Sequence, residues 1–221
     1  MSKSFYFSKE RFFSNKEIIS LLNNRFEEIY KNNIYKSNHS HIREITAKSI
    51  SKEPLFEEIM KKIHKKFEKI TDFLDLKFDK LWLVRSRPNN ANNTTLPYIP
   101  HIDKRRYLKA MVYLHDVHLE HGPIHLGKLK NDINIEQKRK ELPLDYKEKG
   151  LNSIKNDEID GKLNPITGKA GDVIFFDTNT PHKAGIIDKG YSREVLRFDF
   201  ERTLFNPKQS LLNYLINKFP L

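Results

Sequence analysis

The sequence has no cysteine among its 221 residues. Disulfide bridges and thiolate-bound metal ions are therefore excluded, so a metal ion would have to be held by histidine, aspartate or glutamate. Long apolar runs are missing as well. No window approaches the ~18 apolar residues of a membrane span, and the N-terminal MSKSFYFSKERFF lacks the unbroken apolar stretch of a signal peptide. We therefore expect a soluble, cytoplasmic protein without a membrane partner.

Acidic residues are in the minority. There are 29 aspartates and glutamates against 40 lysines and arginines, which leaves a formal net charge of +11. Such an excess can serve a nucleic acid, a membrane surface or an anionic substrate. The chain nevertheless lacks a compact run of about five basic residues interleaved with aromatic ones, the pattern that a nucleic-acid groove favours. We therefore expect no nucleic-acid partner and leave room for a small anionic substrate.

Two amphipathic helices are expected in the N-terminal part of the chain. Residues 15–31 and residues 54–74 both place apolar side chains at helical spacing, with lysine and glutamate between them. Ser14 or Asn15 can cap the first helix, and Pro54 stands where a first-turn proline is tolerated. Both helices should therefore pack on a broad apolar face.

Short strand candidates dominate the rest of the chain, separated by glycine, proline and asparagine signals. The stretch 127–169 is polar and without periodicity, which is typical of a functional loop, a lid or a disordered insertion. A short helix is expected over residues 208–218. The strand candidates are residues 77–86, 98–103, 106–117, 170–177 and 192–202.

The order of these elements predicts one α+β domain over residues 1–221. A helical part, residues 1–76, precedes a barrel over residues 77–205 that carries the polar insertion. Helices followed by a run of strands favour a strand core with helices packed on one sheet. The number of strands fits a double-sheet barrel of the jelly-roll, cupin-like kind.

Three residues form a candidate metal site. His101 and Asp103 lie at the end of a candidate strand, where residues i and i+2 point to the same side. His182 follows the end of a later strand. Two imidazoles and one carboxylate make the facial triad that leaves coordination positions open, as non-haem Fe(II) oxygenases require. The sequence therefore predicts an iron site at His101, Asp103 and His182.

Basic residues on inward strand faces are candidates for binding anions. Alternation puts Arg193, Val195 and Arg197 on one face, away from the apolar face that belongs against the helices. An inward arginine needs an anion, and the far carboxylate of a dicarboxylic cosubstrate would pair with Arg193 in bidentate fashion. Arg197 is the second candidate for that role. Arg85 and Lys109 are candidates for binding a substrate carboxylate or phosphate.

The motifs together resemble the phytanoyl-CoA dioxygenase family. They are HID, YLKAMVYLHDVHLEHGPIHL, ITGKAGDVIFFDTNTPHKAG and SREVLRFDF, over residues 98–128 and 166–200. The resemblance implies a double-stranded β-helix fold that uses Fe(II), 2-oxoglutarate and O2. It also implies that His101, Asp103 and His182 bind the metal, and that Arg193 and Met111 contact the cosubstrate.

The chain departs from the family in two places. Ala184 stands where members often carry a small hydroxyl residue, and Tyr113 could supply a hydroxyl contact in its stead. The segment GPIHLGK lacks the usual Gly-Ser-His and leads into the polar insertion. Because that segment often shapes the substrate pocket, the resemblance says least about the substrate.

The resemblance implies hydroxylation of a C–H bond of a small, anionic or zwitterionic molecule, with release of succinate and CO2. Related halogenases replace the metal-binding carboxylate by a small residue, so Asp103 favours hydroxylation. Two alternatives stay open. The chain could be an oxygenase that acts on a nucleic acid or a protein, or a barrel that binds a ligand without catalysis.

Overall fold

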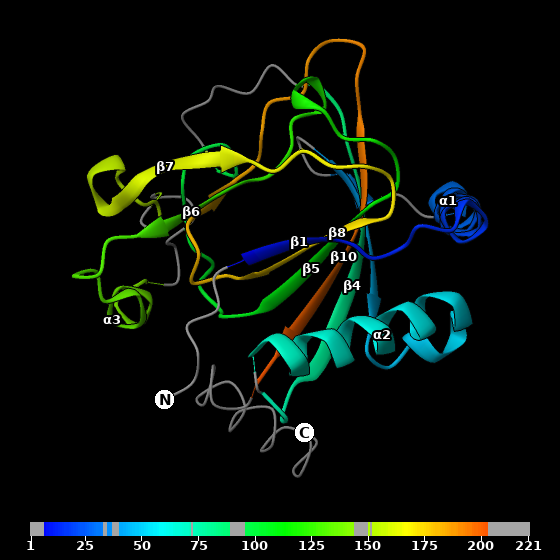
Figure 1. Cartoon of the computed structure of the whole chain (residues 1–221), viewed down its shortest axis with the longest axis horizontal. Helices are drawn as coiled ribbons and strands as arrows, with labels where there is room; N and C mark the ends of the chain where they lie inside the picture. The colour runs from blue at the N-terminus through cyan, green and yellow to red at the C-terminus, as the bar shows by residue number, and fades with distance from the viewer. Residues whose placement is uncertain are drawn as a thin grey trace.

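The computed structural model describes residues 7–32, 35–36, 40–71, 73–88, 96–143, 150 and 152–202 (Figure 1). The helix expected over residues 208–218 lies outside the described residues. The helices are α1 (Lys16–Asn32), α2 (Pro54–Thr71) and α3 (Ile135–Lys140), with the 3-10 turns η1 (Ile50–Lys52), η2 (Leu119–His121) and η3 (Asn156–Glu158). The strands are β1 (Phe7–Arg11), β2 (Tyr35–Lys36), β3 (Ser40–Thr46), β4 (Lys77–Ser86), β5 (Leu108–Tyr113), β6 (His125–Leu129), β7 (Ile159–Pro165), β8 (Asp172–Asp177), β9 (His182–Lys183) and β10 (Arg193–Glu201).

An antiparallel seven-stranded sheet forms the centre of the molecule, in the order β1-β8-β5-β10-β4-β3-β2. Four of its five inner strands, β8, β5, β10 and β4, are among the strands that the sequence predicted. The edge strands β1 and β2, together with β3, belong to the part of the chain that was expected to be helical. These strands are short or carry few apolar residues, so they leave a weak signal in the sequence.

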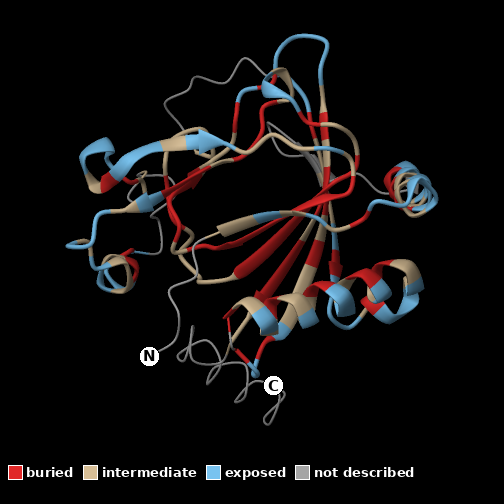
Figure 2. Cartoon of the chain, viewed as in Figure 1, coloured by how far each residue is buried: buried red, intermediate tan, exposed pale blue. Residues whose placement is uncertain are grey.

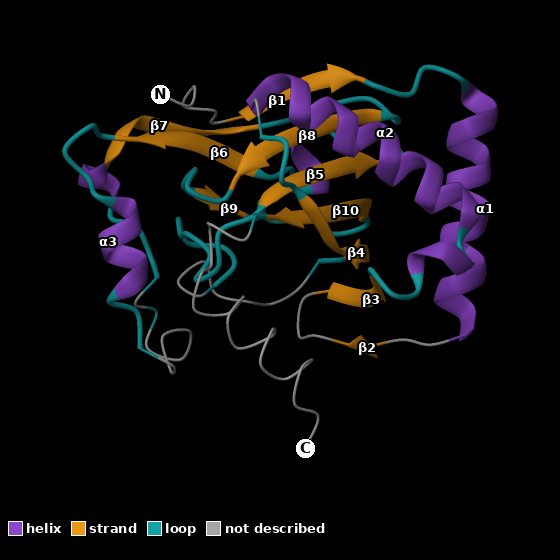
Figure 3. Ribbon diagram, turned by 90° about the horizontal axis from the view of Figure 1, so that it is seen from below, coloured by secondary structure: helices purple, strands orange, loops and turns teal. Residues whose placement is uncertain are grey.

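Helices α1 and α2 cover one face of this sheet (Figures 1 and 3). The buried face of α2 includes Ile59, Ile63 and Phe67, and the ring of Phe67 lies 5.2 Å from Phe175 of β8 and 5.4 Å from Phe200 of β10. Figure 2 shows buried residues along α2 and along the central strands of the sheet. The predicted packing of amphipathic helices on one sheet is therefore confirmed.

The second helix ends earlier than its apolar stripe suggested. The Thr71 hydroxyl donates to the Phe67 carbonyl at 2.7 Å and accepts from the Phe73 amide at 3.3 Å, which closes the last turn. Leu74, which was expected on the apolar stripe, follows that end and is 85% exposed. No helix within the described ranges has the length and apolar character that a membrane crossing needs.

A three-stranded sheet, in the order β7-β6-β9, lies across the open face of the large sheet (Figure 3). Strands β6 and β7 come largely from the stretch 127–169, which was expected to be a loop, a lid or disordered. The described part of that stretch also contains α3 and η3. Most residues of strand β7 are exposed, so its sequence shows no alternation of apolar and polar residues. The expected α+β fold with two sheets and helices on one of them is confirmed.

Candidate metal and cosubstrate site

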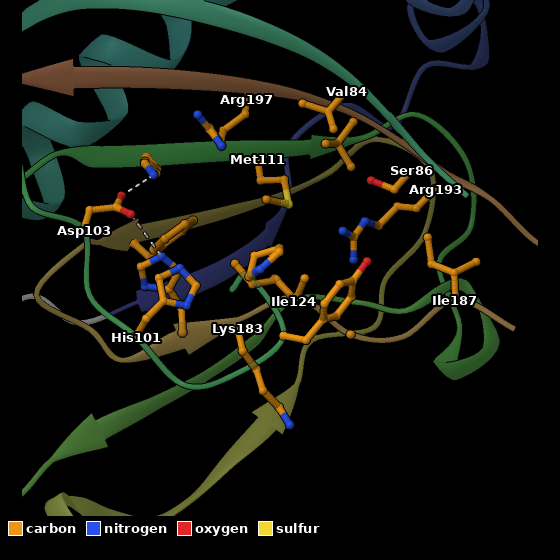
Figure 4. Close-up of a pocket in the computed structure, with 18 of the residues that line it drawn as sticks. Val84, Ser86, His101, Asp103, Met111, Ile124, Lys183, Ile187, Arg193 and Arg197 are labelled. Atoms are coloured by element: carbon orange, nitrogen blue, oxygen red, sulfur yellow. Dashed lines mark hydrogen bonds and ion pairs between the residues drawn. The ribbon is translucent and has the colours of Figure 1, made fainter. Parts of the chain in front are cut away.

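A cavity of about 380 Å³ opens between the two sheets. Its walls come from β4, β5, β8 and β10 of the large sheet and from the segments around residues 97–103 and 182–187. Figure 4 shows His101 and Asp103 at one end, Arg193 and Ser86 at the other, and Met111 between them. The cavity thus brings together residues that are far apart in the sequence.

The three predicted metal ligands meet at one end of this cavity. The two histidines are paired by backbone hydrogen bonds in both directions, each with an N···O distance of 3.0 Å. Their rings lie 4.4 Å apart, and His182 Nε2 is 3.7 Å from Asp103 Oδ1. One ligand atom from each of His101, Asp103 and His182 lies within 4.8 Å of the others. These residues could therefore hold a metal ion.

Both imidazoles are oriented by the backbone. His101 Nδ1 is 2.9 Å from the carbonyl oxygen of Ile99, and His182 Nδ1 is 2.9 Å from that of Thr180. A carbonyl oxygen can only accept, so each Nδ1 must carry the hydrogen. The Nε2 lone pairs are therefore left available to a metal ion, which is the usual arrangement of metal-binding histidines.

The carboxylate of Asp103 is shared between two neighbours. Its Oδ1 faces His182, and its Oδ2 accepts a hydrogen bond from the ammonium group of Lys109. Burial raises the pKa of Asp103, but the charge of Lys109, followed by the contact with His182, outweighs it and holds the pKa well below its usual range. Asp103 is therefore ionised at neutral pH, and Lys109 holds the oxygen that faces away from His182.

Arg193 is a buried cation with unused donors. The residue is 7% exposed, and its Nε and Nη1 atoms have no hydrogen-bond partner. Burial lowers its pKa, which shows that its charged form is poorly solvated. In the β10–β4 ladder Arg193 stands directly opposite Ser86, so both side chains face the cavity. Such a group calls for an anion, and the donor set fits the carboxylate of a cosubstrate.

Arg85 does not face the cavity, and its placement on an inward face was wrong. Its guanidinium lies 4.9 Å from the ring of Tyr30 on α1 and pairs with Glu194 at 3.1 Å and with Glu27. Two carboxylates and an aromatic ring therefore hold this cation on the helix side of the sheet. The cavity is lined instead by its neighbours Val84 and Ser86.

The other predicted residues have mixed placements. Lys109, Met111 and Arg197 line the cavity. Arg197 is also paired with Asp199, at 3.0 Å from Nε and 3.1 Å from Nη2, so its charge is already balanced. Tyr113 is buried behind the cavity, and its hydroxyl donates to the Ile166 carbonyl at 2.6 Å. That hydroxyl is therefore occupied.

Sequence reasoning missed two hydroxyl residues of the cavity, Ser86 and Tyr98. The alternation of β4 puts Ser86 on the face opposite to Arg85, so a correct choice of the inward face would have found it. Tyr98 lies in a loop without periodicity, and no pattern in the sequence marks it. Ala184, which replaces the expected hydroxyl residue, also lines the cavity.

The buried imidazole of His101 predicts a pH-dependent stability of the metal-free protein. Burial, followed by the neighbouring His182, lowers the pKa of His101 to about 3. Below pH ~6.5 this histidine is protonated in the unfolded chain but stays neutral in the folded chain. The free energy of unfolding therefore falls by at most ~1.4 kcal/mol for each pH unit. We expect this group to cost about 1.6 kcal/mol between pH 6.5 and pH 5.

Chemical denaturation of the metal-free protein at several pH values measures this effect. The His101→Gln variant, which cannot bind the proton, should lose correspondingly less stability over the same range. Equal pH dependence in the two proteins would show that His101 is not a buried neutral imidazole.

Comparison with solved structures shows that the chain shares the cupin-like fold of several 2-oxoglutarate-dependent enzymes. The epimerase SnoN from nogalamycin biosynthesis, described as a non-haem alpha-ketoglutarate-dependent enzyme, matches with a TM-score of 0.62 and 13% identity, over 90% of this chain and 78% of that chain. HygX from Streptomyces hygroscopicus, solved with nickel and 2-oxoglutarate, matches with a TM-score of 0.61 and 14% identity, over 90% and 83%. A Pseudomonas putida prolyl-4-hydroxylase matches with a TM-score of 0.57 and 16% identity, over 90% and 94%.

A family model matches part of the chain. Residues 88–193 match the sequence model described as phytanoyl-CoA dioxygenase (PhyH). The resemblance drawn from the motifs is thereby confirmed for this part of the chain, which contains all four residues His101, Asp103, His182 and Arg193. No curated protein matches the chain.

Proposed function

We propose that this protein is an Fe(II)- and 2-oxoglutarate-dependent dioxygenase that hydroxylates a C–H bond of a small anionic or zwitterionic molecule. One atom of O2 enters the product as a hydroxyl group and the other enters succinate, while CO2 leaves 2-oxoglutarate. The observation that carries the proposal is the buried Arg193, with unpartnered donors, in the same cavity as a two-histidine, one-carboxylate cluster.

His101, Asp103 and His182 are the proposed iron ligands. Bound Fe(II) would supply the activation of O2, and the three side chains would leave further coordination positions for the cosubstrate and O2. The backbone carbonyls that accept from both Nδ1 atoms orient the imidazoles before the metal arrives. Lys109 restrains Asp103 so that one carboxylate oxygen faces the metal position.

Arg193 is the proposed anchor for the distal carboxylate of 2-oxoglutarate. It lies at the end of the cavity opposite the triad, with Met111 between (Figure 4), and we propose that the two carboxylate ends of 2-oxoglutarate face these two ends. Ser86 stands beside it and Tyr98 also lines the cavity, and we propose that their hydroxyls bind the cosubstrate in place of Ala184, which has no hydroxyl. The hydroxyl of Tyr113, which the sequence suggested for this contact, donates to the Ile166 carbonyl at 2.6 Å.

The charges of the cavity support an anionic or zwitterionic substrate. Its charged lining residues are four cations and one anion, and the anion Asp103 is already paired with Lys109. With Arg193 assigned to the cosubstrate, Lys183 remains to meet a substrate carboxylate or phosphate, and Arg197 would have to exchange its contact with Asp199 to do so. HygX has been solved with hygromycin B and SnoN with nogalamycin RO, so this fold accommodates small molecules of different shapes.

Succinate formation tests the proposal. The pure protein with Fe(II), ascorbate and 2-oxoglutarate should release succinate slowly, and a pool of anionic or zwitterionic metabolites should contain a compound that accelerates it. His182→Ala is the control and should form no succinate above background.

The product should gain the mass of one oxygen atom. An unchanged mass would point to epimerisation, and a loss of two hydrogens to ring closure or desaturation. If the wild-type protein does not bind 2-oxoglutarate, the proposal that it is a 2-oxoglutarate-dependent enzyme is refuted.

A further inference from the structure

A buried arginine links the two chain segments that carry the proposed metal ligands, from outside the cavity. Arg139 belongs to the short helix α3 in the polar stretch 127–169, and it is 7% exposed. Its Nε donates to the backbone carbonyl of Asp103 at 3.0 Å, and its Nη2 donates to the side-chain oxygen of Asn179 at 2.5 Å. Asn179 lies in the turn that leads from β8 to His182. One guanidinium therefore bridges the Asp103 segment and the His182 segment.

Further contacts of α3 reinforce this bridge. Glu136 accepts from Arg139 at 3.0 Å and from the Asn179 amide at 3.0 Å, so the three side chains form a closed ring of hydrogen bonds. Glu136 also meets Arg106, which binds Asp177 at the end of β8 at 2.7 Å. The network thus joins α3 to both sides of the triad.

The next segment of the insertion holds the residue between the two ligands of the His-x-Asp pair. The Asn152 side chain donates to the Ile102 carbonyl at 2.9 Å, and the Ile102 amide donates to the Asn152 carbonyl at 3.0 Å. Asn152 and Ile102 are both buried, with 3% and 0% exposure. Strand β5 begins only at Leu108, so the insertion restrains this stretch together with the backbone bridge between His101 and His182.

The contacts of Arg139 are better suited to positioning the segments of Asp103 and His182 than to stabilising the fold in general. A buried guanidinium costs free energy unless its N–H groups are satisfied, and here they are satisfied only while both ligand segments keep their positions. None of Arg139, Asn179 and Glu136 lines the cavity. Metal affinity depends on ligand positions to within about 0.5 Å, so a restraint on the ligand backbones acts on it directly.

We propose that Arg139 is a positioning residue that fastens the insertion to the metal centre and preorganises Asp103 and His182. The proposal rests on the proposed function, because it presupposes that the triad binds a metal. It assigns to the insertion a role in metal affinity that is exercised by residues outside the cavity.

Binding of Mn²⁺ to the full-length protein tests this role without relying on turnover. Arg139→Met should weaken Mn²⁺ binding in calorimetry by roughly 10- to 100-fold, as for other residues that orient metal ligands. Arg139→Lys keeps the charge but cannot span three acceptors at once, so its loss should be intermediate. The matched control is Lys138→Met, which also removes one ion pair of α3, the one with Glu158 at 2.5 Å. It should bind Mn²⁺ within about twofold of the wild type.

The melting temperature separates positioning from a purely structural role. If Arg139 only stabilised the fold, Arg139→Met would melt earlier while its folded fraction bound Mn²⁺ normally, and that result would overturn the proposal. If Arg139→Met does not fold, Asn179→Ala, which removes only the link to the His182 segment, should still weaken binding several-fold, and unchanged binding there would overturn it. A wild-type protein that binds Mn²⁺ no better than His101→Ala would refute the metal centre itself.

Discussion

Replacing Arg193 by methionine is expected to make the protein more stable and unable to bind 2-oxoglutarate. The guanidinium is 7% exposed, and two of its donor nitrogens lack partners, so the cosubstrate-free protein bears the cost of an uncompensated buried charge. Methionine has a similar length and no charge, so we expect a gain of about 1–3 kcal/mol in the free energy of unfolding. Removal of a bidentate, charge-assisted pair should weaken 2-oxoglutarate binding at least ~100-fold.

Calorimetry with 2-oxoglutarate and denaturant unfolding without it measure the two effects. The matched control is Arg197→Met, because Arg197 lines the same cavity but is already paired with Asp199. Its removal should lower stability rather than raise it, and should leave 2-oxoglutarate binding largely intact. An Arg193→Met protein that is destabilised and still binds 2-oxoglutarate would contradict the assignment of Arg193.

Replacing Asp103 by alanine should abolish metal binding and also destabilise the metal-free protein. The ammonium group of Lys109, which is 6% exposed, contacts the Asp103 carboxylate. Removal of the carboxylate leaves that charge buried without its counter-ion, which should cost about 3 kcal/mol. The metal loses one of three protein ligands at the same time, so Mn²⁺ binding should fall below detection.

A double-mutant cycle separates the two consequences. Adding Lys109→Met to Asp103→Ala removes the stranded charge, and we expect stability to return most of the way to the wild-type value while metal binding stays absent. Lys109→Met alone should keep measurable Mn²⁺ binding because all three ligands remain. Unfolding in the presence of a chelator gives the stabilities. If Asp103→Ala is as stable as the wild type, the Lys109 contact does not contribute as proposed.

Much of the site could be predicted because strand alternation and local motifs are properties of neighbouring residues. His101 and Asp103 are two positions apart, and the order of motifs placed His182 and Arg193 beside them. Arg85 was misplaced for a physical reason: alternation divides β4 into two faces but does not say which face the helices cover. The side of the sheet on which Arg85 lies is set by its contacts with Glu27, Tyr30 and Glu194, which come from distant parts of the chain.

The secondary structure of the polar stretch 127–169 could not be predicted from the pattern of its sequence. Its strand β7 lies at the edge of the small sheet with an exposed face, so its sequence needs no apolar alternation. Helix α3 is six residues long and has only one buried residue, Arg139, so no amphipathic stripe marks it. Both elements are stabilised by partners elsewhere in the chain, such as Asp103 and Asn179 for Arg139.

The sequence by itself determined the class of metal ligands, since a chain without cysteine can offer only imidazoles and carboxylates. It also determined the α+β class and the helices that cover one sheet, because these depend on local spacing and periodicity, while the resemblance of its motifs implied the fold family. Only the tertiary structure decided which face of each strand lines the cavity, that Arg193 keeps unpartnered donors, that Lys109 holds Asp103, and that Arg139 bridges the ligand segments. These features depend on charges and hydrogen-bond partners from distant segments, which meet only when the chain is folded.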